Sequence, residues 1–180
     1  GETAATFIAT TSGNYSVTVS NGLCATTSSA IAVTVSVLPT VSISAGSATD
    51  FCTGGSVVLT ANGAGSYQWF NNGVALGITT QTYTASVSGN YTVMVTNSNG
   101  CSAVSAAVTV NATAAPVASI TAQGATTFCA GGSVVLAANG AGAYQWTNNG
   151  TPINGATAAT YTATAAGNYS VVISNGSCTA

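Results

Sequence analysis

The sequence predicts an all-β protein made of tandem antiparallel β-sandwich modules of about 77 residues each, with no helix. Three observations lead to this prediction. An internal repeat has a fixed period, apolar residues alternate at period two, and glycine-rich turns separate the alternating segments. A fixed period indicates a row of similar modules, and the alternation indicates short strands with one buried face.

The repeat is visible in two blocks of sequence. The segment F-C-T-G-G-S-V-V-L-T at 51–60 returns as F-C-A-G-G-S-V-V-L-A at 128–137, and Y-Q-W at 67–69 returns at 144–146. Both displacements equal 77. A third signal, the triplet G-N-Y, begins at residues 13, 89 and 167 and drifts from this period by only one residue.

The period predicts three modules and a longer parent chain. Residues 1–38 are expected to be the C-terminal part of one module. Residues 39–115 are expected to form a complete module, and residues 116–180 a module that lacks its last strand.

The strands of the complete module follow from its alternating segments. We expect them at Thr40–Ser44, Ser56–Asn62, Ser66–Asn71, Gln81–Ala85, Asn90–Asn97 and Ser102–Val110. Asn72-Gly73 comes directly after the third segment and predicts a tight hairpin, because both residues adopt positive φ angles. About seven strands in ~77 residues suit a small sandwich.

The alternation also predicts which side chains form the core. The residues expected to point inward include one tryptophan, one leucine and one tyrosine in each of the two later modules: Trp69, Leu59, Tyr91, Trp146, Leu136 and Tyr169. Both tryptophans are interpreted as core residues that pack between the two sheets.

The composition excludes most kinds of active site. The chain has no lysine, arginine or histidine, and Glu2 and Asp50 are its only acids. General acid–base catalysis and activated nucleophiles need such groups, so we expect no enzyme, no catalytic residue and no cofactor. With a formal net charge of −2 and no basic side chain, the chain is also a poor partner for nucleic acid.

Membrane insertion and metal binding are not expected either. Gly, Ser, Thr and Asn interrupt every apolar run well short of the ~18 residues that a spanning helix needs. The cysteines lack C-x-x-C spacing and a histidine partner, and two acids cannot supply a calcium shell. A surface that is hydrated by Thr, Ser and Asn is typical of extracellular fibrous and adhesive proteins.

Several segments carry a resemblance to known proteins. S-V-V-L-T-A, then Y-Q-W, then T-Y-T-A with G-N-Y-T-V resembles immunoglobulin-like repeats, and Tyr91 and Tyr169 stand at the position of the tyrosine corner. Ala61 and Val93 stand where such domains usually carry their inter-sheet cysteines. The usual disulfide of this fold is therefore absent.

A second resemblance is narrower. F-C-x-G-G-S-V-V-L before the second strand and N-G-C after the sixth are similar to the tandem immunoglobulin-like (PKD-like) repeats of giant surface adhesins of Bacteroidetes, including gliding-motility adhesins. This resemblance implies export by the type IX secretion system, an extracellular or cell-surface location, and a structural or adhesive role in a stalk or filament. The partners it implies are neighbouring modules of the same chain, surface polysaccharide and the secretion or motility machinery.

The five cysteines, Cys24, Cys52, Cys101, Cys129 and Cys178, allow two pairing schemes. The simplest scheme joins the two cysteines of each module, Cys52 with Cys101 and Cys129 with Cys178. In an immunoglobulin sandwich, however, these positions lie at opposite poles, and a disulfide needs Cα atoms within roughly 7 Å. Head-to-tail stacking would instead bring Cys52 to Cys178. We favour this inter-module pairing, and the alternative stays open.

A carbohydrate-binding module is the alternative function. It requires exposed aromatic side chains on one face, and Tyr67, Phe70 and Tyr144 are the candidates. Phe70 is replaced by Thr147 in the next module, so such a platform would not repeat.

Overall fold

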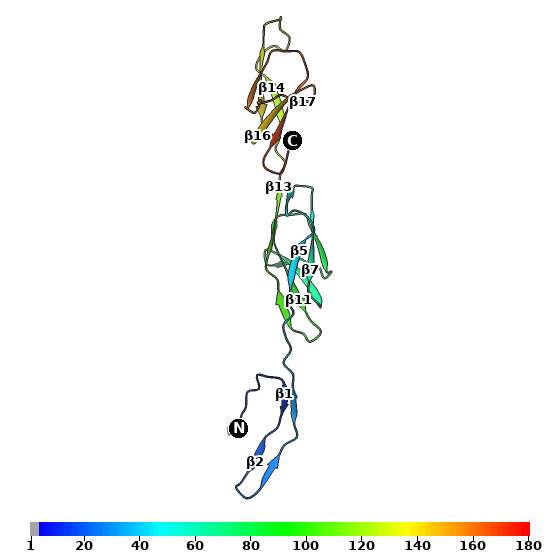
Figure 1. Cartoon of the computed structure of the whole chain (residues 1–180), viewed down its shortest axis with the longest axis vertical. Helices are drawn as coiled ribbons and strands as arrows, with labels where there is room; N and C mark the ends of the chain where they lie inside the picture. Colours follow the sequence, from blue (N-terminus) through cyan, green and yellow to red (C-terminus); the bar gives the residue numbers. More distant parts are fainter. Residues whose placement is uncertain (1–3) are drawn as a thin grey trace.

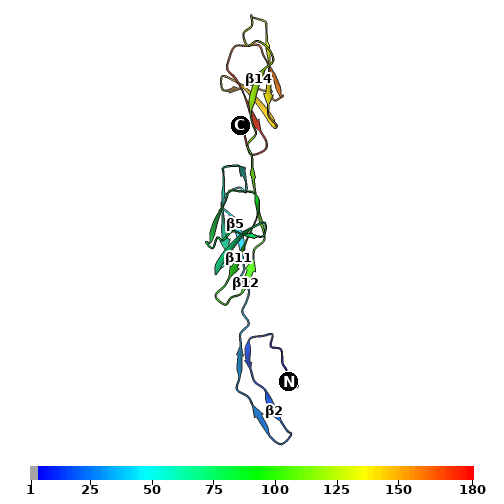
Figure 2. The ribbon, with the colours of Figure 1, turned by 180° about the vertical axis from the view of Figure 1, so that it is seen from behind.

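The computed structural model describes residues 4–180, and within that range every regular element is a β-strand. The strands form three groups that follow one another along a thin, extended molecule (Figures 1 and 2). No helix long and apolar enough to cross a membrane occurs in the described part of the chain.

The middle group is a sandwich of two sheets. One sheet has the strand order β10 (Thr82–Ala85), β7 (Val57–Asn62) and β5 (Ser42–Ala45). The strand order of the other is β6 (Asp50–Cys52), β13 (Val108–Thr113), β11 (Gly89–Thr96), β8 (Ser66–Asn71) and β9 (Val74–Ala75), while β12 (Ser102–Val104) also pairs with β11. From β5 to β11 the chain passes repeatedly between the two sheets, with only β8 and β9 consecutive in one sheet, as in an immunoglobulin-like sandwich.

The core of this sandwich comes from the inward faces of β7, β8 and β11. Leu59, Trp69 and Tyr91 are fully buried there. The indole Nε1–H of Trp69 donates to the Thr80 carbonyl over 2.9 Å, and the Tyr91 hydroxyl donates to the Val87 carbonyl over 2.9 Å. The second bond is the tyrosine corner, which ties the start of β11 to the turn before it.

The strands of the middle group differ from the sequence prediction in two ways. Residues Ser102–Val110 form two strands, β12 and β13, because the buried Ser105 interrupts the ladder. Its hydroxyl accepts from the Val93 N–H, and its own N–H donates to the Val93 carbonyl. The sequence analysis also missed two short strands: β6, which pairs in parallel with β13, and β9, which pairs with β8.

The third group repeats this plan in residues 119–174. One sheet contains β14 (Ser119–Ala122), β15 (Val134–Asn139) and β18 (Thr160–Ala163), and the other contains β17 (Thr151–Pro152), β16 (Ala143–Asn148) and β19 (Tyr169–Ser174). Trp146 and Leu136 are buried, whereas Tyr169 is only half-buried. In the middle group Tyr91 pairs with Val108 of β13, and residues 4–180 provide no such strand beside Tyr169.

The first group consists of two strand pairs. β1 (Gly13–Tyr15) pairs with β4 (Ile31–Val33), and β2 (Thr18–Ser20) pairs with β3 (Ala25–Thr27). No second sheet covers these pairs within the described chain, and none of residues 4–38 is buried. The Tyr15 hydroxyl nevertheless donates to the Thr11 carbonyl, which repeats the tyrosine corner a third time.

Candidate functional site

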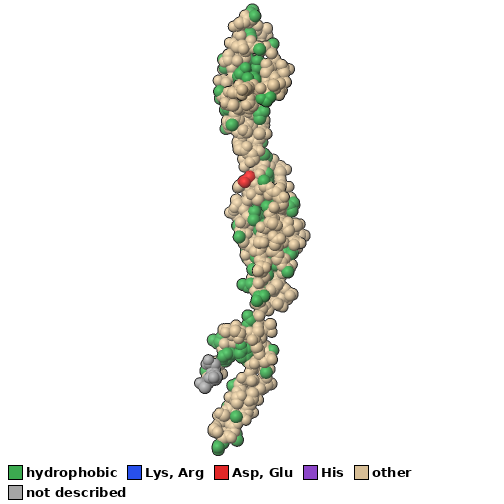
Figure 3. Space-filling view, in the orientation of Figure 1, with side chains coloured by type: hydrophobic (Ala, Val, Ile, Leu, Met, Phe, Trp, Pro, Cys, Tyr) green, Lys and Arg blue, Asp and Glu red, His purple; other side chains and the backbone are tan. Residues whose placement is uncertain are grey.

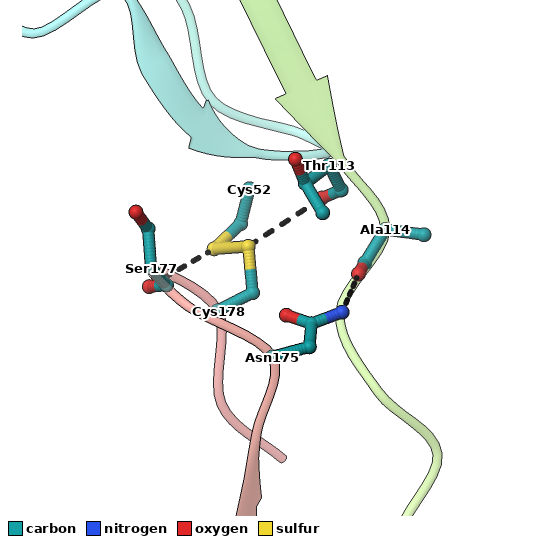
Figure 4. The surroundings of a disulfide bond; sticks show 6 residues. All are labelled: Cys52, Thr113, Ala114, Asn175, Ser177 and Cys178. Carbon is teal, nitrogen blue, oxygen red and sulfur yellow. Dashed lines mark hydrogen bonds between the residues drawn. A yellow bond between two sulfur atoms is a disulfide. The ribbon is translucent and has the colours of Figure 1, made fainter. Parts of the chain in front are cut away.

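The candidate site is a disulfide between the middle and third groups of strands, which are called the middle and third modules from here on. Cys52 is bonded to Cys178, their Cα atoms are 5.5 Å apart, and 126 positions separate them in the sequence. Figure 4 shows the bond between the cyan end of the middle group and the red hairpin of the third group, beside the chain that links them. This is the inter-module pairing that the sequence analysis favoured.

Cys52 is presented by a turn that the sequence repeat encodes. Phe51 packs against the core of the middle group, and Cys52 is the next residue, at the end of β6. The Gly55 N–H then donates to the Cys52 carbonyl over 2.8 Å, and Gly54 has a φ of 97°. A glycine at the third position of such a turn is favoured because a side chain there is strained. The F-C-x-G-G motif therefore anchors the phenylalanine and turns the chain directly after the cysteine.

Cys178 is held by the hairpin that follows β19. The Asn175 N–H donates to the Cys178 carbonyl over 3.0 Å, and the Cys178 side chain is fully buried. Its Sγ atom lies 3.5 Å from the carbonyl oxygen of Thr113, and the Cys52 Sγ atom lies 3.6 Å from the Ser177 carbonyl oxygen. The bridge is therefore packed between backbone atoms of both modules.

One hydrogen bond supports the same junction. The Asn175 side chain donates from Nδ2 to the Ala114 carbonyl over 2.9 Å. Ala114 is the first residue after β13, so this bond and the disulfide lie side by side where the chain crosses to the third module (Figure 4). The sequence analysis did not single out Asn175. The available signal was an asparagine three or four residues before Cys24, Cys101 and Cys178.

The junction between the first group of strands and the middle module, called the first junction, repeats these contacts. The Cys101 thiol lies 3.8 Å from the Ser36 carbonyl oxygen, and Asn97 Nδ2 donates to the Val37 carbonyl over 3.0 Å. Ser36 and Val37 precede Thr113 and Ala114 by one period of the repeat. Cys101 thus occupies the position of Cys178 one module earlier.

The remaining cysteines are unpaired in residues 4–180. Cys101 is half-buried, while Cys24 and Cys129 are exposed. Cys129 is the counterpart of Cys52 and follows a half-buried phenylalanine, Phe128, in the same turn. The two within-module bonds of the alternative scheme are not formed.

Charge contributes little at this junction. Asp50, two residues before Cys52, accepts from Asn111 Nδ2 over 2.6 Å. It is the single charged side chain in residues 4–180 and appears as the red patch near the junction in Figure 3. Nor do the described residues contain a group of three or more acidic, cysteine or histidine side chains that could hold a metal ion.

The aromatic candidates for sugar binding serve the cores instead. Tyr67 and Tyr144 are half-buried, pack against their modules, and donate their hydroxyls to the carbonyls of Gly63 and Gly140. Phe70 is half-buried on β8 opposite Thr92. These three side chains therefore do not form a shared exposed platform.

A row of aromatic rings that the sequence analysis missed runs through each core. Trp69 and Tyr83 have ring centroids 5.9 Å apart, and Tyr83 and Tyr91 have centroids 5.5 Å apart. Trp146, Tyr161 and Tyr169 repeat the row at 5.9 and 5.6 Å. The T-Y-T-A segments at 82–85 and 160–163 supplied the signal for the middle ring.

The third module contains a cavity of about 720 Å³ lined in part by Ile120, Phe128, Leu136 and Tyr169. The corresponding side chains of the middle module, Ile43, Phe51, Leu59 and Tyr91, belong to one core, and β13 pairs beside Tyr91 and Phe51. The cavity therefore lies where β13 lies in the middle module. We interpret it as a strand-sized groove.

No family model matches the sequence, and no curated protein matches it. Among solved structures, the three N-terminal domains of the bacteriophage RB49 highly immunogenic outer capsid protein (Hoc) share 20% identity over 79% of this chain, with a TM-score of 0.43. The match spans 56% of that structure, a little over half of its length.

Two further solved structures are similar in part. The fibronectin(III)-like modules of Clostridium thermocellum CbhA share 13% identity over 76% of this chain and 88% of theirs, with a TM-score of 0.41. The human OSCAR ligand-binding domain shares 20% identity over 76% of this chain and 90% of its own, with a TM-score of 0.36.

Proposed function

We propose that this chain is a structural segment of a secreted surface adhesin or filament, in which immunoglobulin-like modules are coupled head to tail. The observation that supports this proposal is the Cys52–Cys178 disulfide, which joins neighbouring modules beside the peptide link. Two covalent connections at one junction restrict bending more than one connection does. The proposed partners of each module are therefore its neighbours in the same chain.

The proposed location is extracellular, at the cell surface. Persistent structural disulfides are typical of oxidising compartments and are rare in the cytosol of most organisms. The absence of lysine and arginine also removes every trypsin cleavage site, which suits an exposed filament. The narrower proposal, export by a type IX system in a gliding bacterium with surface polysaccharide or the motility machinery as partners, rests on the F-C-x-G-G and N-G-C motifs.

Small-angle X-ray scattering tests the coupled spacer. The oxidised chain should keep one extended shape, while the Cys52→Ser, Cys178→Ser double variant should show a broader distribution of shapes with a smaller mean dimension. Cys129→Ser, which removes an exposed unpaired thiol, is the matched control and should scatter like the wild type. Identical scattering from the wild type and the double variant would refute the coupling.

Location is tested on the organism that makes the protein. Antibodies against the middle module should label intact cells without permeabilisation. Labelling that appears only after lysis would exclude a surface filament.

A further inference from the structure

The disulfide encloses most of the chain in a covalent loop. It connects residues 126 positions apart, so residues 53–177 lie inside the loop, and residues 1–52 and 178–180 lie outside it. Only the two outer segments belong to the shortest covalent path between the termini. A force applied to the termini therefore cannot extend the enclosed segment, even if its modules unfold.

The junction is arranged so that both connections run together. β13 ends at Thr113, whose carbonyl oxygen contacts Cys178, and Thr113 pairs with Cys52 in the parallel register of β6 and β13. The Thr53 N–H also donates to the Thr113 carbonyl over 2.8 Å. The peptide link and the disulfide thus leave the middle module at the same level, and a load along the rod reaches both.

The period of the repeat gives this loop a further consequence. Cys101 contacts Ser36 as Cys178 contacts Thr113, so the junction recurs once in each period. The sequence separation of 126 exceeds one period but not two. Where each junction carries the bond, successive loops therefore overlap. The shortest covalent path along such an array crosses one disulfide, which spans 126 positions, and then follows the chain to the disulfide that starts two periods after the first. Because two periods contain ~154 residues, ~28 residues of chain remain in this path for every two modules.

The folded length of one module is the distance between two successive junctions. Cys101 lies at one junction and Thr113 at the next, so the chain from Cys101 to Thr113 crosses one module. This stretch is ~12 residues long, so at ~3.3 Å per residue one module adds at most ~40 Å and two add ~80 Å. About 28 fully extended residues span ~100 Å. A stapled array would therefore lengthen by a quarter or somewhat more on complete unfolding, whereas ~77 free residues per module would reach ~270 Å, which is more than sixfold.

We propose that the inter-module disulfide strongly limits how far the array can lengthen under tension. This inference rests on the proposed function, since only a load-bearing segment would use such a limit. It differs from the proposed stiffness, because a joint that bends freely would still have the same maximum length.

Single-molecule stretching of the full chain by its two termini tests the proposal. The oxidised wild type should reach a contour length of ~190 Å, and the Cys52→Ser, Cys178→Ser double variant should reach ~630 Å, about threefold more. Cys129→Ser should behave as the wild type does, because it leaves the loop intact.

Other pairings give other lengths. A lone Cys52–Cys101 bond encloses far fewer residues and predicts ~460 Å, and both within-module bonds together predict ~290 Å. Any of these longer values for the wild type would overturn the proposal. The short contour length expected of the wild type, together with unchanged scattering of the double variant, would instead keep the extension limit and refute the stiff spacer.

Discussion

The Sγ atom of Cys178 lies 3.5 Å from the carbonyl oxygen of Thr113, and the Sγ atom of Cys101 lies 3.8 Å from that of Ser36. The two contacts are one period apart, and each places a cysteine from the hairpin of one module against the chain that leaves the module before it: Thr113 ends β13, and Ser36 follows β4. At the second junction Cys52 completes the disulfide. Cys52 is thus the group that converts a packing contact into a covalent joint.

Removal of the disulfide should destabilise the two modules that it joins. A loop of this size restricts the unfolded chain, and native disulfides typically contribute ~2–4 kcal/mol. Cys178→Ser should therefore lower the free energy of unfolding by about that amount, as measured by urea denaturation under oxidising conditions. Cys129→Ser should leave the free energy of unfolding nearly unchanged. Equal stability of the Cys178→Ser variant and the wild type would contradict this account.

Trp69 should contribute strongly to the middle module. Trp69→Phe removes the hydrogen bond to the Thr80 carbonyl and leaves part of the buried volume empty, so we expect a loss of about 2–4 kcal/mol. Trp146 then remains as the single tryptophan and reports on the third module by its fluorescence. Denaturant unfolding followed by circular dichroism and by Trp146 emission measures the two modules together and the third separately. In Trp69→Phe the middle module should unfold before the third module. In Trp146→Phe, the matched variant, the third module should unfold first.

The stability of the middle module should fall in alkaline solution. Burial raises the pKa of Tyr91 above its ordinary value of 10.0, and the neighbouring Tyr83 raises that pKa further. The unfolded chain therefore loses this proton at a lower pH than the folded chain does. The contribution of the neutral phenol to stability is complete below pH 10 and declines as the pH rises from 10 through the folded pKa.

Urea denaturation at several pH values between 9 and 11.5 measures this decline. Tyr91→Phe should be less stable at pH 8, because it lacks the bond to the Val87 carbonyl, and its stability should depend less on pH above 10. Tyr169→Phe is the matched variant, because Tyr169 is the half-buried counterpart of Tyr91 in the third module and its hydroxyl donates to the Ala165 carbonyl. An unchanged alkaline decline in Tyr91→Phe would show that another group causes it.

Gly89 should not tolerate a side chain. A Cβ atom at this position would overlap Oδ1 of Asn71, a buried oxygen without a hydrogen-bond partner. We expect Gly89→Ala to lower the free energy of unfolding by about 1–3 kcal/mol, because the Asn71 side chain must move away and disturb its Nδ2 hydrogen bond to the Tyr91 hydroxyl. Gly46→Ala is the control, since its Cβ would meet the Val58 carbonyl at an ordinary 3.4 Å.

A double variant checks the cause of that effect. If the overlap with Asn71 is responsible, Asn71→Ala combined with Gly89→Ala should be more stable than the sum of the two single losses predicts. Strict additivity of the two changes, measured by thermal unfolding, would place the cost elsewhere.

The sequence by itself determined the strand pattern and its period. Alternation placed Leu59, Trp69 and Tyr91 inside, because successive side chains of a strand point to opposite faces, and the structure buries all three. The repeated F-C-x-G-G motif also established the period of the repeat. These features depend on neighbours in the chain, so they can be read from local spacing.

The tertiary structure decided what depends on contacts between distant segments. The parallel pairing of β6 with β13 joins segments that are far apart in sequence. The break of the last strand at Ser105 comes from its hydrogen bonds with Val93 on the neighbouring strand β11. The degree of burial of Tyr169 depends on whether a strand lies beside it, which the tyrosine's own sequence does not specify. The choice of Cys178 over Cys101 as the partner of Cys52 also required the stacked modules, because a disulfide forms between the thiols that folding brings within reach.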